Sequence, residues 1–592
     1  MGRSWLGVTL LASLVVILAT EWLTPRQHSL PAFTPLALNV LAFAAFTSLV
    51  ITAINRTLFS IGLVTALYEL LVLCNRLKVG YLSTPIHPAD LFVVSNVVYV
   101  DLFAGRVLAA AAVAIFALVV GLVVLFRVRS FAATVHDRCL AAALSLLLHV
   151  GLTTSYRYPE ARTFLQARGV ASYTPNPSIE LEYNGLLLNL LLHVGDLMVP
   201  VPTGYDEATV RKIMSSLSPD PLLNPTTADG RRVNLVMFVV EAMMDPTDLG
   251  LRFSSDPMPF FHGLRQRFSS GWAYSPEVGG KSANPEFEIL SGLATYYLPR
   301  ESVPYMTFVS RPLPALPRFF SERKYHVSAL HVDTLGFFNY VEVYRDFGFS
   351  DARTIRSRPG VQLDAAGRVP SDEALVDFMT EVSRESKPFF LFAFTNATHL
   401  PYNYSAYLAS DLEILDPLPQ PIHDEVKTYV NALRTTDRAI QKLIDFFERF
   451  PDPVVVVILG DHLPGLSAEA MAQSEVARAK SYVDGLALSH RCPVVLWSNM
   501  GTEKRDFEVS FNFLGQRILA EMGTAPTGVW RTNAGMASRY PVLSKFVQTS
   551  DGRRFLPEDL PAVDAQQIAD YGLIQYDLLF GRQYSLEKRS PG

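Results

Sequence analysis

VVVVILGDH, residues 454–462, is a short run that is apolar from its first residue until an aspartate and a histidine close it. Such a run is typical of a β-strand that is covered on both faces. Helical patterns such as residues 424–450 lie between runs of this kind, so the sequence predicts an α/β domain with a mostly parallel central sheet. The other runs are VNLVMFVVE (233–241), HVSALHVD (326–333), FFLFAFTNATH (389–399) and CPVVLWS (492–498).

Side chains that can bind a metal or transfer a proton stand at the carboxyl ends of four runs. In sheets of this kind, ligands bind beyond the carboxyl ends of the strands. Taken alone, these side chains have simpler explanations: Glu241 as a helix cap, His399 as a loop histidine and Asp461 as a turn residue. Four strand ends with the same chemistry together predict a functional site. The residues are Glu241, His331 with Asp333, His399, and Asp461 with His462.

The segment GGKSANPEFEILSGL (279–293) supplies a candidate nucleophile. Paired glycines precede Lys281 and Ser282, and a helical pattern with Pro285 in its first turn follows, which places Ser282 at a helix N-cap. A plain cap is one interpretation of this serine. The other is catalytic, because a helix N-terminus offers free N–H groups to a phosphoryl group and Lys281 adds a cation.

The order of these motifs resembles the lipoteichoic acid synthase and phosphoglycerol transferase family of the alkaline phosphatase/sulfatase superfamily. The segments that carry the resemblance are GGKSANPEFEILSGL, LHVDTLGFFNYVEVYRDFGF and ILGDH. The resemblance implies a polytopic helical membrane domain, a linker and an extracytoplasmic sulfatase-like catalytic domain. We expect these parts at residues 1–155, 156–230 and 231–592.

The resemblance also implies one divalent metal ion and a nucleophile. Ser282 stands where the family has a threonine nucleophile. The expected ion is manganese, and magnesium and zinc are also compatible with two carboxylates, an imidazole and an alkoxide. The implied metal ligands are Glu241, Ser282, Asp461 and His462.

A second group of residues is implied to bind the phosphoglycerol head group. Phe338 stands where some members have tryptophan, and Tyr340 stands where some have an arginine that grips the phosphate. Lys281 or Arg345 could replace the missing cation. The implied head-group residues are His331, Asp333, Phe338, Tyr340 and His399.

The expected activity is a two-step transfer of glycerophosphate from phosphatidylglycerol to an envelope glycan or polyglycerophosphate acceptor. Ser282 attacks phosphorus, His399 donates a proton to the departing diacylglycerol, and Lys281 stabilises charge on the phosphoryl oxygens. A phosphoethanolamine transferase or a lipid phosphodiesterase of the same superfamily is the alternative. A sulfatase is disfavoured because the segment after Ser282 lacks the C/S-x-P-x-R pattern.

The first quarter of the chain has the composition of a membrane domain. Residues 1–155 contain nine Lys or Arg and five Asp or Glu, whereas the whole chain of 592 residues has 51 and 56. Apolar runs close to the ~20 residues that cross a bilayer predict five spanning helices. They lie at about 5–23, 34–54, 58–74, 106–126 and 139–154. The apolar stretch 185–198 is shorter and predicts an interfacial or docking helix.

The loop 127–138 contains three arginines and is the clearest cytoplasmic signal. With five spans, this orientation places residues 156–592 outside the bacterial cytoplasmic membrane; the reverse orientation is the alternative.

Residues 156–592 carry a net charge of −9, which excludes nucleic acid as a partner. Cys492 is their single cysteine, so neither a disulfide framework nor a cysteine zinc site is available. His87 and Asp90, beside prolines, predict a capped turn or contact with a lipid head group.

Overall fold

The computed structural model forms two compact units, which are described separately. One contains Met1–Val199 and Pro299–Ser302, and the other contains Pro200–Leu298 and Val303–Gly592. We call them the helical unit and the sheet unit. The structure describes residues 4–23, 31–82, 85–92, 121, 124, 126–127, 133–156, 158–171, 177–197, 199–215, 224–300, 302–332, 335, 337–356, 358–410 and 412–586.

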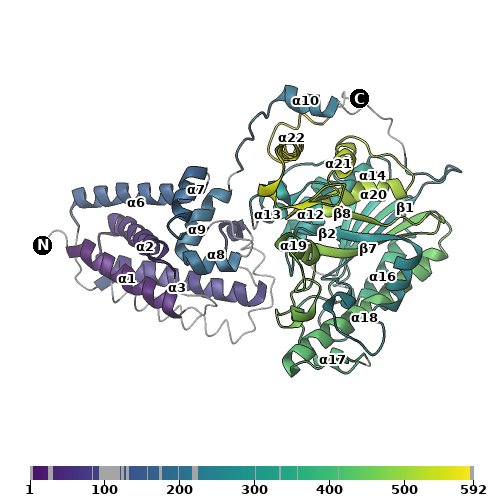
Figure 1. The fold of residues 1–592 in the computed structure, drawn as a ribbon, viewed down its shortest axis with the longest axis horizontal. Helices are drawn as coiled ribbons and strands as arrows, with labels where there is room; N and C mark the ends of the chain where they lie inside the picture. Colours follow the sequence, from purple (N-terminus) through teal and green to yellow (C-terminus); the bar gives the residue numbers. More distant parts are fainter. Residues whose placement is uncertain are drawn as a thin grey trace. The chain divides into compact units, whose positions relative to one another are not determined.

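Four long apolar helices make up most of the helical unit, and each is long and apolar enough to cross a membrane. Helix α2 packs against the other three (Figure 1). Four of the five predicted spans are therefore helical, whereas the span predicted at 106–126 lies almost entirely outside the described residues. The four helices are α1 (Ser4–Leu23), α2 (Phe33–Ile54), α3 (Thr57–Leu82) and α6 (Val135–Ser155).

The stretch predicted to be an interfacial or docking helix forms the eight-residue α9 (Leu186–His193), which packs against α2 and α6. Asn39 fixes this contact, because its side chain donates to the carbonyl oxygen of Asn184 over 2.6 Å and accepts from the N–H of Leu188 over 2.9 Å. The short helices α7 (Pro159–Gln166) and α8 (Pro177–Asn184) precede α9. A docking role for this stretch fits these contacts.

The loop with His87 and Asp90 forms a capped turn. The Asp90 carboxylate accepts the N–H of His87 over 2.8 Å and pairs with Lys78 over 2.7 Å. A 3-10 helix, Pro88–Phe92, follows. These bonds support the structural interpretation of the loop, and contact with a lipid head group stays a prediction.

The sheet unit is built on an eight-stranded sheet in the order β4-β3-β5-β1-β6-β7-β2-β8. Only β7 runs antiparallel to its neighbours, which confirms the mostly parallel sheet. The strands are β1 (Asn234–Val240), β2 (Ser269–Tyr274), β3 (His326–His331), β4 (Asp351–Thr354), β5 (Phe389–Phe394), β6 (Val454–Gly460), β7 (Arg491–Ser498) and β8 (Phe507–Ser510). A small sheet contains β9 (Val542–Leu543), β10 (Val547–Gln548) and β11 (Arg554–Phe555).

Helices cover both faces of this sheet (Figure 1). Helices α16 (Asp372–Val382) and α18 (Gln420–Glu448) lie on one face. On the other lie α12 (Ala283–Ser291), α14 (Leu316–Ser321), α20 (Leu514–Glu521) and α21 (Val529–Ala537). Every residue of β1, β5 and β6 is buried, as their unbroken apolar runs predict. The remaining helices are α10 (Glu207–Ser215), α11 (Pro259–Arg267), α13 (Pro304–Thr307), α15 (Tyr340–Phe347), α17 (Ser405–Leu408), α19 (Tyr482–His490) and α22 (Ala562–Leu579).

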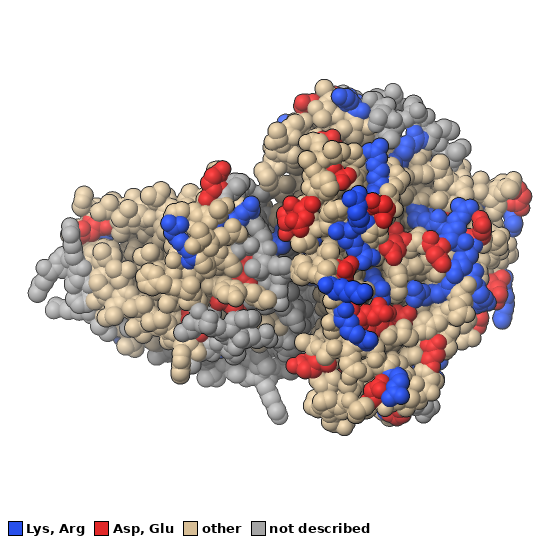
Figure 2. Space-filling model, viewed as in Figure 1, with Lys and Arg blue, Asp and Glu red and all other residues tan. Residues whose placement is uncertain are grey.

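The charges of the two units differ in the way the composition predicts. In the view of Figure 2, the helical unit exposes few charged side chains, whereas the sheet unit exposes many of both signs. An apolar surface on long helices fits a hydrocarbon environment, and a mixed charged surface fits water.

Candidate metal centre and nucleophile

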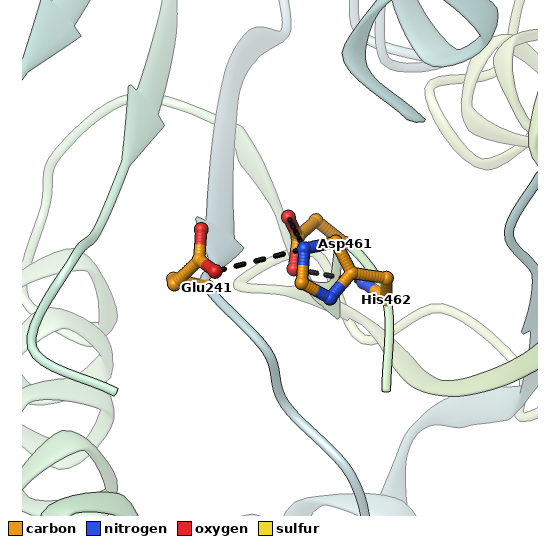
Figure 3. Close-up of side chains that lie close together, drawn as sticks. All are labelled: Glu241, Asp461 and His462. Carbon is orange, nitrogen blue, oxygen red and sulfur yellow. Dashed lines mark hydrogen bonds and ion pairs between the residues drawn. The ribbon is translucent and has the colours of Figure 1, made fainter. Parts of the chain in front are cut away.

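The pairing of β1 with β6 creates a cluster of possible metal ligands. The two strands run parallel, with Val240 opposite Gly460. The residues that follow these two, Glu241 and Asp461, therefore lie side by side at the carboxyl edge of the sheet, and His462 comes next (Figure 3). The potential ligand atoms of the three residues lie within 4.8 Å of one another, and all three residues are buried.

Backbone hydrogen bonds orient the aspartate and the histidine. Asp461 Oδ1 accepts the N–H groups of Ala242, over 2.7 Å, and of His462, over 2.8 Å. His462 Nδ1 lies 2.8 Å from the carbonyl oxygen of Leu463. This leaves His462 Nε2 facing the two carboxylates, 3.2 Å from Asp461 Oδ2 and 3.6 Å from Glu241 Oε1. Asp461 Oδ2 itself is fully buried and has no hydrogen-bond partner.

Burial places two acids and one base in an environment that disfavours charge. Burial and the neighbouring Asp461 raise the pKa of Glu241 to about 8. Burial acts to lower the pKa of His462, but the negative charges of Asp461 and Glu241 outweigh it and raise that pKa. Two buried carboxylates that share one imidazole are stabilised by an added cation, so the donor set fits a divalent ion.

Ser282 joins this cluster from the start of α12. It is the N-cap residue, as the sequence predicts, but its hydroxyl makes no capping bond to its own helix. The hydroxyl instead donates to Glu241 Oε2 over 3.1 Å and lies 3.3 Å from His462 Nε2. The interpretation of this serine side chain as a plain cap is therefore wrong.

The glycines before Ser282 bring the loop to the end of β6. Gly279 has a φ of +74° and donates its N–H to the carbonyl oxygen of Leu463 over 2.9 Å. A Cβ atom on Gly279 would lie 3.3 Å from the Cα of Gly465, so the backbone segments that contain these two glycines approach closely. Lys281 follows with a φ of +57°, a left-handed conformation that is uncommon for lysine.

Three of the predicted head-group residues, His331, Phe338 and Tyr340, form an aromatic group at the end of β3. The His331 ring is buried, and its centroid lies 4.6 Å from that of Tyr340. Burial lowers the pKa of His331 to about 3, so the ring is neutral. Phe338 has a φ of +50°, and its ring centroid lies 6.1 Å from that of Tyr340. Asp333 lies outside the described residues.

The predicted proton donor His399 is exposed, and so is Arg345, one of the two predicted replacement cations. His399 follows β5, the strand between β3 and β1, and its Nδ1 lies 2.7 Å from the carbonyl oxygen of Leu400. Arg368 holds this loop, because its guanidinium donates to the carbonyl oxygen of His399 over 3.2 Å. Arg345 is largely exposed and pairs with Glu342 over 2.5 Å.

Sequence reasoning missed several residues that support the two groups. The N–H of Glu241 donates to the Thr395 hydroxyl over 3.1 Å, and the Thr398 hydroxyl donates to the carbonyl oxygen of Glu241. Glu286, one turn after Ser282, is fully buried. The stretch PEFEIL has two carboxylates, Glu286 and Glu288, among apolar residues, and this was a signal that could have identified Glu286.

A groove of about 810 Å³ lies away from this cluster. Its lining residues include Arg449 and Phe450, which follow α18 and precede β6, so the groove lies where β6 begins. The candidate site lies where β6 ends. The groove therefore forms no part of the metal cluster.

Comparisons with known proteins agree with this fold. Residues 233–524 match the Sulfatase family. A protein of Rhizobium meliloti (strain 1021) described as a cyclic beta-1,2-glucan modification protein is 28% identical over 574 residues, which cover 94% of this chain and 87% of that protein.

Two solved structures are also similar. The Streptococcus pyogenes phosphoglycerol transferase GacH, in complex with sn-glycerol-1-phosphate, has a TM-score of 0.53 at 19% identity and covers 65% of this chain and 97% of its own. The integral membrane lipooligosaccharide phosphoethanolamine transferase EptA of Neisseria meningitidis has a TM-score of 0.46 at 15% identity and covers 84% and 96%. Residues 233–524 are therefore similar to the Sulfatase family, and the chain shares its fold with the GacH structure.

Proposed function

We propose that the protein is a membrane-anchored, metal-dependent transferase that moves glycerophosphate from phosphatidylglycerol to an envelope glycan or polyglycerophosphate acceptor. One observation carries the proposal. The Ser282 hydroxyl turns away from its own helix and lies within hydrogen-bond distance of a buried carboxylate and an imidazole. A serine held in this way has the environment of a nucleophile.

The residues of the cluster fit a divalent metal ion. The fully buried Asp461 Oδ2 has no hydrogen-bond partner, which leaves a lone pair available to a cation. Glu241, His462 and the Ser282 hydroxyl would complete an oxygen and nitrogen donor set that suits manganese and also accepts magnesium or zinc. When bound, such an ion lowers the pKa of a coordinated hydroxyl and neutralises charge on phosphoryl oxygens.

The chain's own residues account for the remaining chemistry. In the first step, Ser282 Oγ forms a bond to phosphorus, the bond from phosphorus to the diacylglycerol oxygen breaks, and His399 gives that oxygen a proton. In this structure the Ser282 hydroxyl proton points to Glu241, its nearest carboxylate acceptor. In the second step, an acceptor hydroxyl forms a bond to phosphorus and gives its proton to His399, the bond from phosphorus to Ser282 Oγ breaks, and Ser282 Oγ takes back the proton that Glu241 accepted in the first step.

His331, Asp333, Phe338 and Tyr340 are proposed to hold the donor head group, and Lys281 to stabilise its charge. The four long apolar helices support a lipid donor, since they keep the protein at the bilayer that contains it. The glucan modification described for the Rhizobium meliloti relative supports a glycan acceptor. We place the catalytic domain, from about residue 231, outside the cytoplasmic membrane.

The test uses the purified full-length protein with manganese and phospholipids labelled in the head group. We expect label from phosphatidylglycerol to move to the wild-type protein and to an added glycan, with release of diacylglycerol. Ser282→Ala should abolish all three events, whereas Ser282→Thr should keep them. Ser538→Ala, which changes an exposed serine outside the cluster, should behave as wild type.

Each other outcome contradicts a named part of the proposal. Label transfer from phosphatidylethanolamine alone would make the protein a phosphoethanolamine transferase. Release of labelled glycerophosphate to water without transfer would make it a phosphodiesterase. Diacylglycerol release by Ser282→Ala at the wild-type rate would refute the nucleophile.

A further inference from the structure

The groove of about 810 Å³ near the start of β6 is lined by positive charges. It lies where α16 and α18 end and where β5 and β6 begin. Its lining residues include one carboxylate, that of Asp445. In the view of Figure 2, Lys and Arg side chains gather on the right of the sheet unit, where α16 is labelled in Figure 1. The five cations of the groove are Arg384, Lys387, Arg438, Lys442 and Arg449.

This positive groove belongs to a part of the chain that is acidic as a whole. Residues 156–592 carry a net charge of −9. A cleft lined by charges of one sign focuses the electrostatic field and raises the local concentration of ligands of the opposite sign. The groove is therefore a place where this acidic protein can attract an anionic ligand.

Two phenylalanines hold two of these cations in place without neutralising them. The rings of Phe446 and Phe450 pack together, with centroids 5.8 Å apart. The guanidinium carbon of Arg384 lies 5.1 Å from the Phe446 centroid, and Nζ of Lys387 lies 4.8 Å from the Phe450 centroid. The face of an aromatic ring attracts a cation but carries no net charge, so the positive charge stays available to a ligand.

The arginines at the ends of α16 and α18 differ from the other cations of the groove. Arg384 and Arg449 are exposed, and neither makes an ion pair within the part of the chain that the structure describes. The other three cations are partnered by carboxylates, in the pairs Lys387 with Asp452, Lys442 with Asp377 and Arg438 with Glu373.

Two guanidinium groups without carboxylate partners suit phosphodiester groups. A guanidinium presents its N–H donors in a planar fork that matches two oxygens of one phosphate. A phosphodiester keeps one negative charge at neutral pH. The volume of the groove is that of a site for a ligand much larger than one phosphate. A chain with repeated phosphodiester groups therefore fits the groove better than a single small anion.

The groove and the metal cluster lie at opposite ends of β6. This strand has seven residues, which at about 3.3 Å each place the two at least about 20 Å apart. A lipid head group at the cluster cannot reach the groove, whereas a polymer can contact both. An extended chain also fills a groove, which a flat membrane surface does not.

We propose that the groove is a second binding site, which holds the phosphodiester groups of a chain of glycerophosphate units while an end of the chain is extended at the metal cluster. Arg384 and Arg449 bind the phosphate oxygens, and no bond is made or broken in the groove. The inference rests on the proposed function, which supplies such a chain, and it names a polymer of glycerophosphate as the acceptor.

The test measures binding of a fluorescent six-unit glycerophosphate oligomer to the full-length protein in detergent. A chelator is present, so that the metal cluster does not contribute a bound ion. We expect the wild type to bind the oligomer more weakly as salt rises, and an uncharged glycerol oligomer of the same length not to bind. Arg384→Gln/Arg449→Gln should raise Kd at least about 10-fold, because two charge-assisted hydrogen-bonding groups are lost.

Arg505→Gln/Arg553→Gln is the matched control. It removes the same charge from two exposed arginines outside the groove, which pair with Glu503 and Asp551. The control should bind the oligomer as wild type does. In the transfer assay with the oligomer as acceptor, the groove variant should raise KM for the oligomer, and the control should not.

Equal binding by the wild type and the groove variant, or an equal loss in the control, would overturn the inference. A groove variant that loses binding to phosphatidylglycerol vesicles but keeps binding to the oligomer would also overturn it, because the groove would then contact the membrane. Binding needs no transfer, so the two proposals fail separately. Binding that depends on the groove in a protein that transfers no glycerophosphate would refute the proposed function alone.

Discussion

The substitution Asp461→Asn tests whether the cluster of Glu241, Asp461 and His462 binds a metal. An asparagine can keep the fold, because its Oδ1 can accept the same N–H groups, those of Ala242 and His462, that Asp461 Oδ1 accepts. The substitution removes one buried negative charge from a group of donor atoms that lie within 4.8 Å of one another. Asp461→Asn therefore removes the charge of this side chain and keeps its structural hydrogen bonds.

The expected loss of metal affinity follows from the charge of the carboxylate, and the expected change in Tm follows from the size of the folded unit. A charge pair at about 4 Å contributes about 4 kcal/mol at an effective dielectric constant of about 20, which is about 1000-fold in Kd. Metal at about 100 times the wild-type Kd stabilises the folded protein by about 2.7 kcal/mol. For a unit of about 390 residues, with about 2 cal/mol/K of unfolding entropy per residue, this raises Tm by about 3 °C.

The assay is a thermal melt of the purified protein in detergent, first with a chelator and then with manganese added. Wild type should gain about 3 °C and Asp461→Asn less than about 0.5 °C at the same manganese concentration. Asp437→Asn is the control, since Asp437 also accepts two N–H groups but lies outside the cluster. A full manganese shift in Asp461→Asn would refute the metal site.

Three further changes test other parts of the structure. Gly460→Ala would place a Cβ 2.4 Å from the carbonyl oxygen of Met243, and the resulting backbone shift should lower the transfer rate roughly 100-fold in the labelled-lipid assay. The hydrogen bond to Asp245 raises the pKa of His262 to about 9. Protonated His262 should stabilise the folded protein by up to about 3 kcal/mol below pH 6.5, and this stabilisation should be lost as the pH rises through 9. In urea unfolding, His262→Asn should therefore lower the free energy of unfolding less and less over this pH range. Leu459→Ala, which shortens a fully buried side chain of β6, should cost about 2 to 5 kcal/mol in the same measurement.

The sequence predicted the parts of the fold that depend on local pattern. The runs at 233–241 and 454–462 were predicted to be strands because each is apolar, and both form strands. The residues at their carboxyl ends were predicted to form a site because ligands bind beyond that edge of such a sheet. Strand β2 was not recognised, since SSGWAY contains serines and a glycine and has no apolar run. The antiparallel direction of β7 depends on its neighbours and not on its own residues.

The same division applies to the candidate site. Ser282 was identified from its place between glycines and a helix, but the direction of its hydroxyl depends on Glu241, which is 41 positions earlier. The hydrogen bond between Tyr344 and His331 joins α15 to the end of β3. No spacing within one element could have predicted it.

The position of β6 between β1 and β7 has a consequence for synthesis of the protein. The ribosome completes Glu241 and Ser282 long before it reaches Asp461 and His462. Until β6 inserts beside β1, the serine and the glutamate are present without the two residues that complete the cluster. A chain released early, or one that stalls in folding before this insertion, therefore contains the proposed nucleophile but not the assembled cluster.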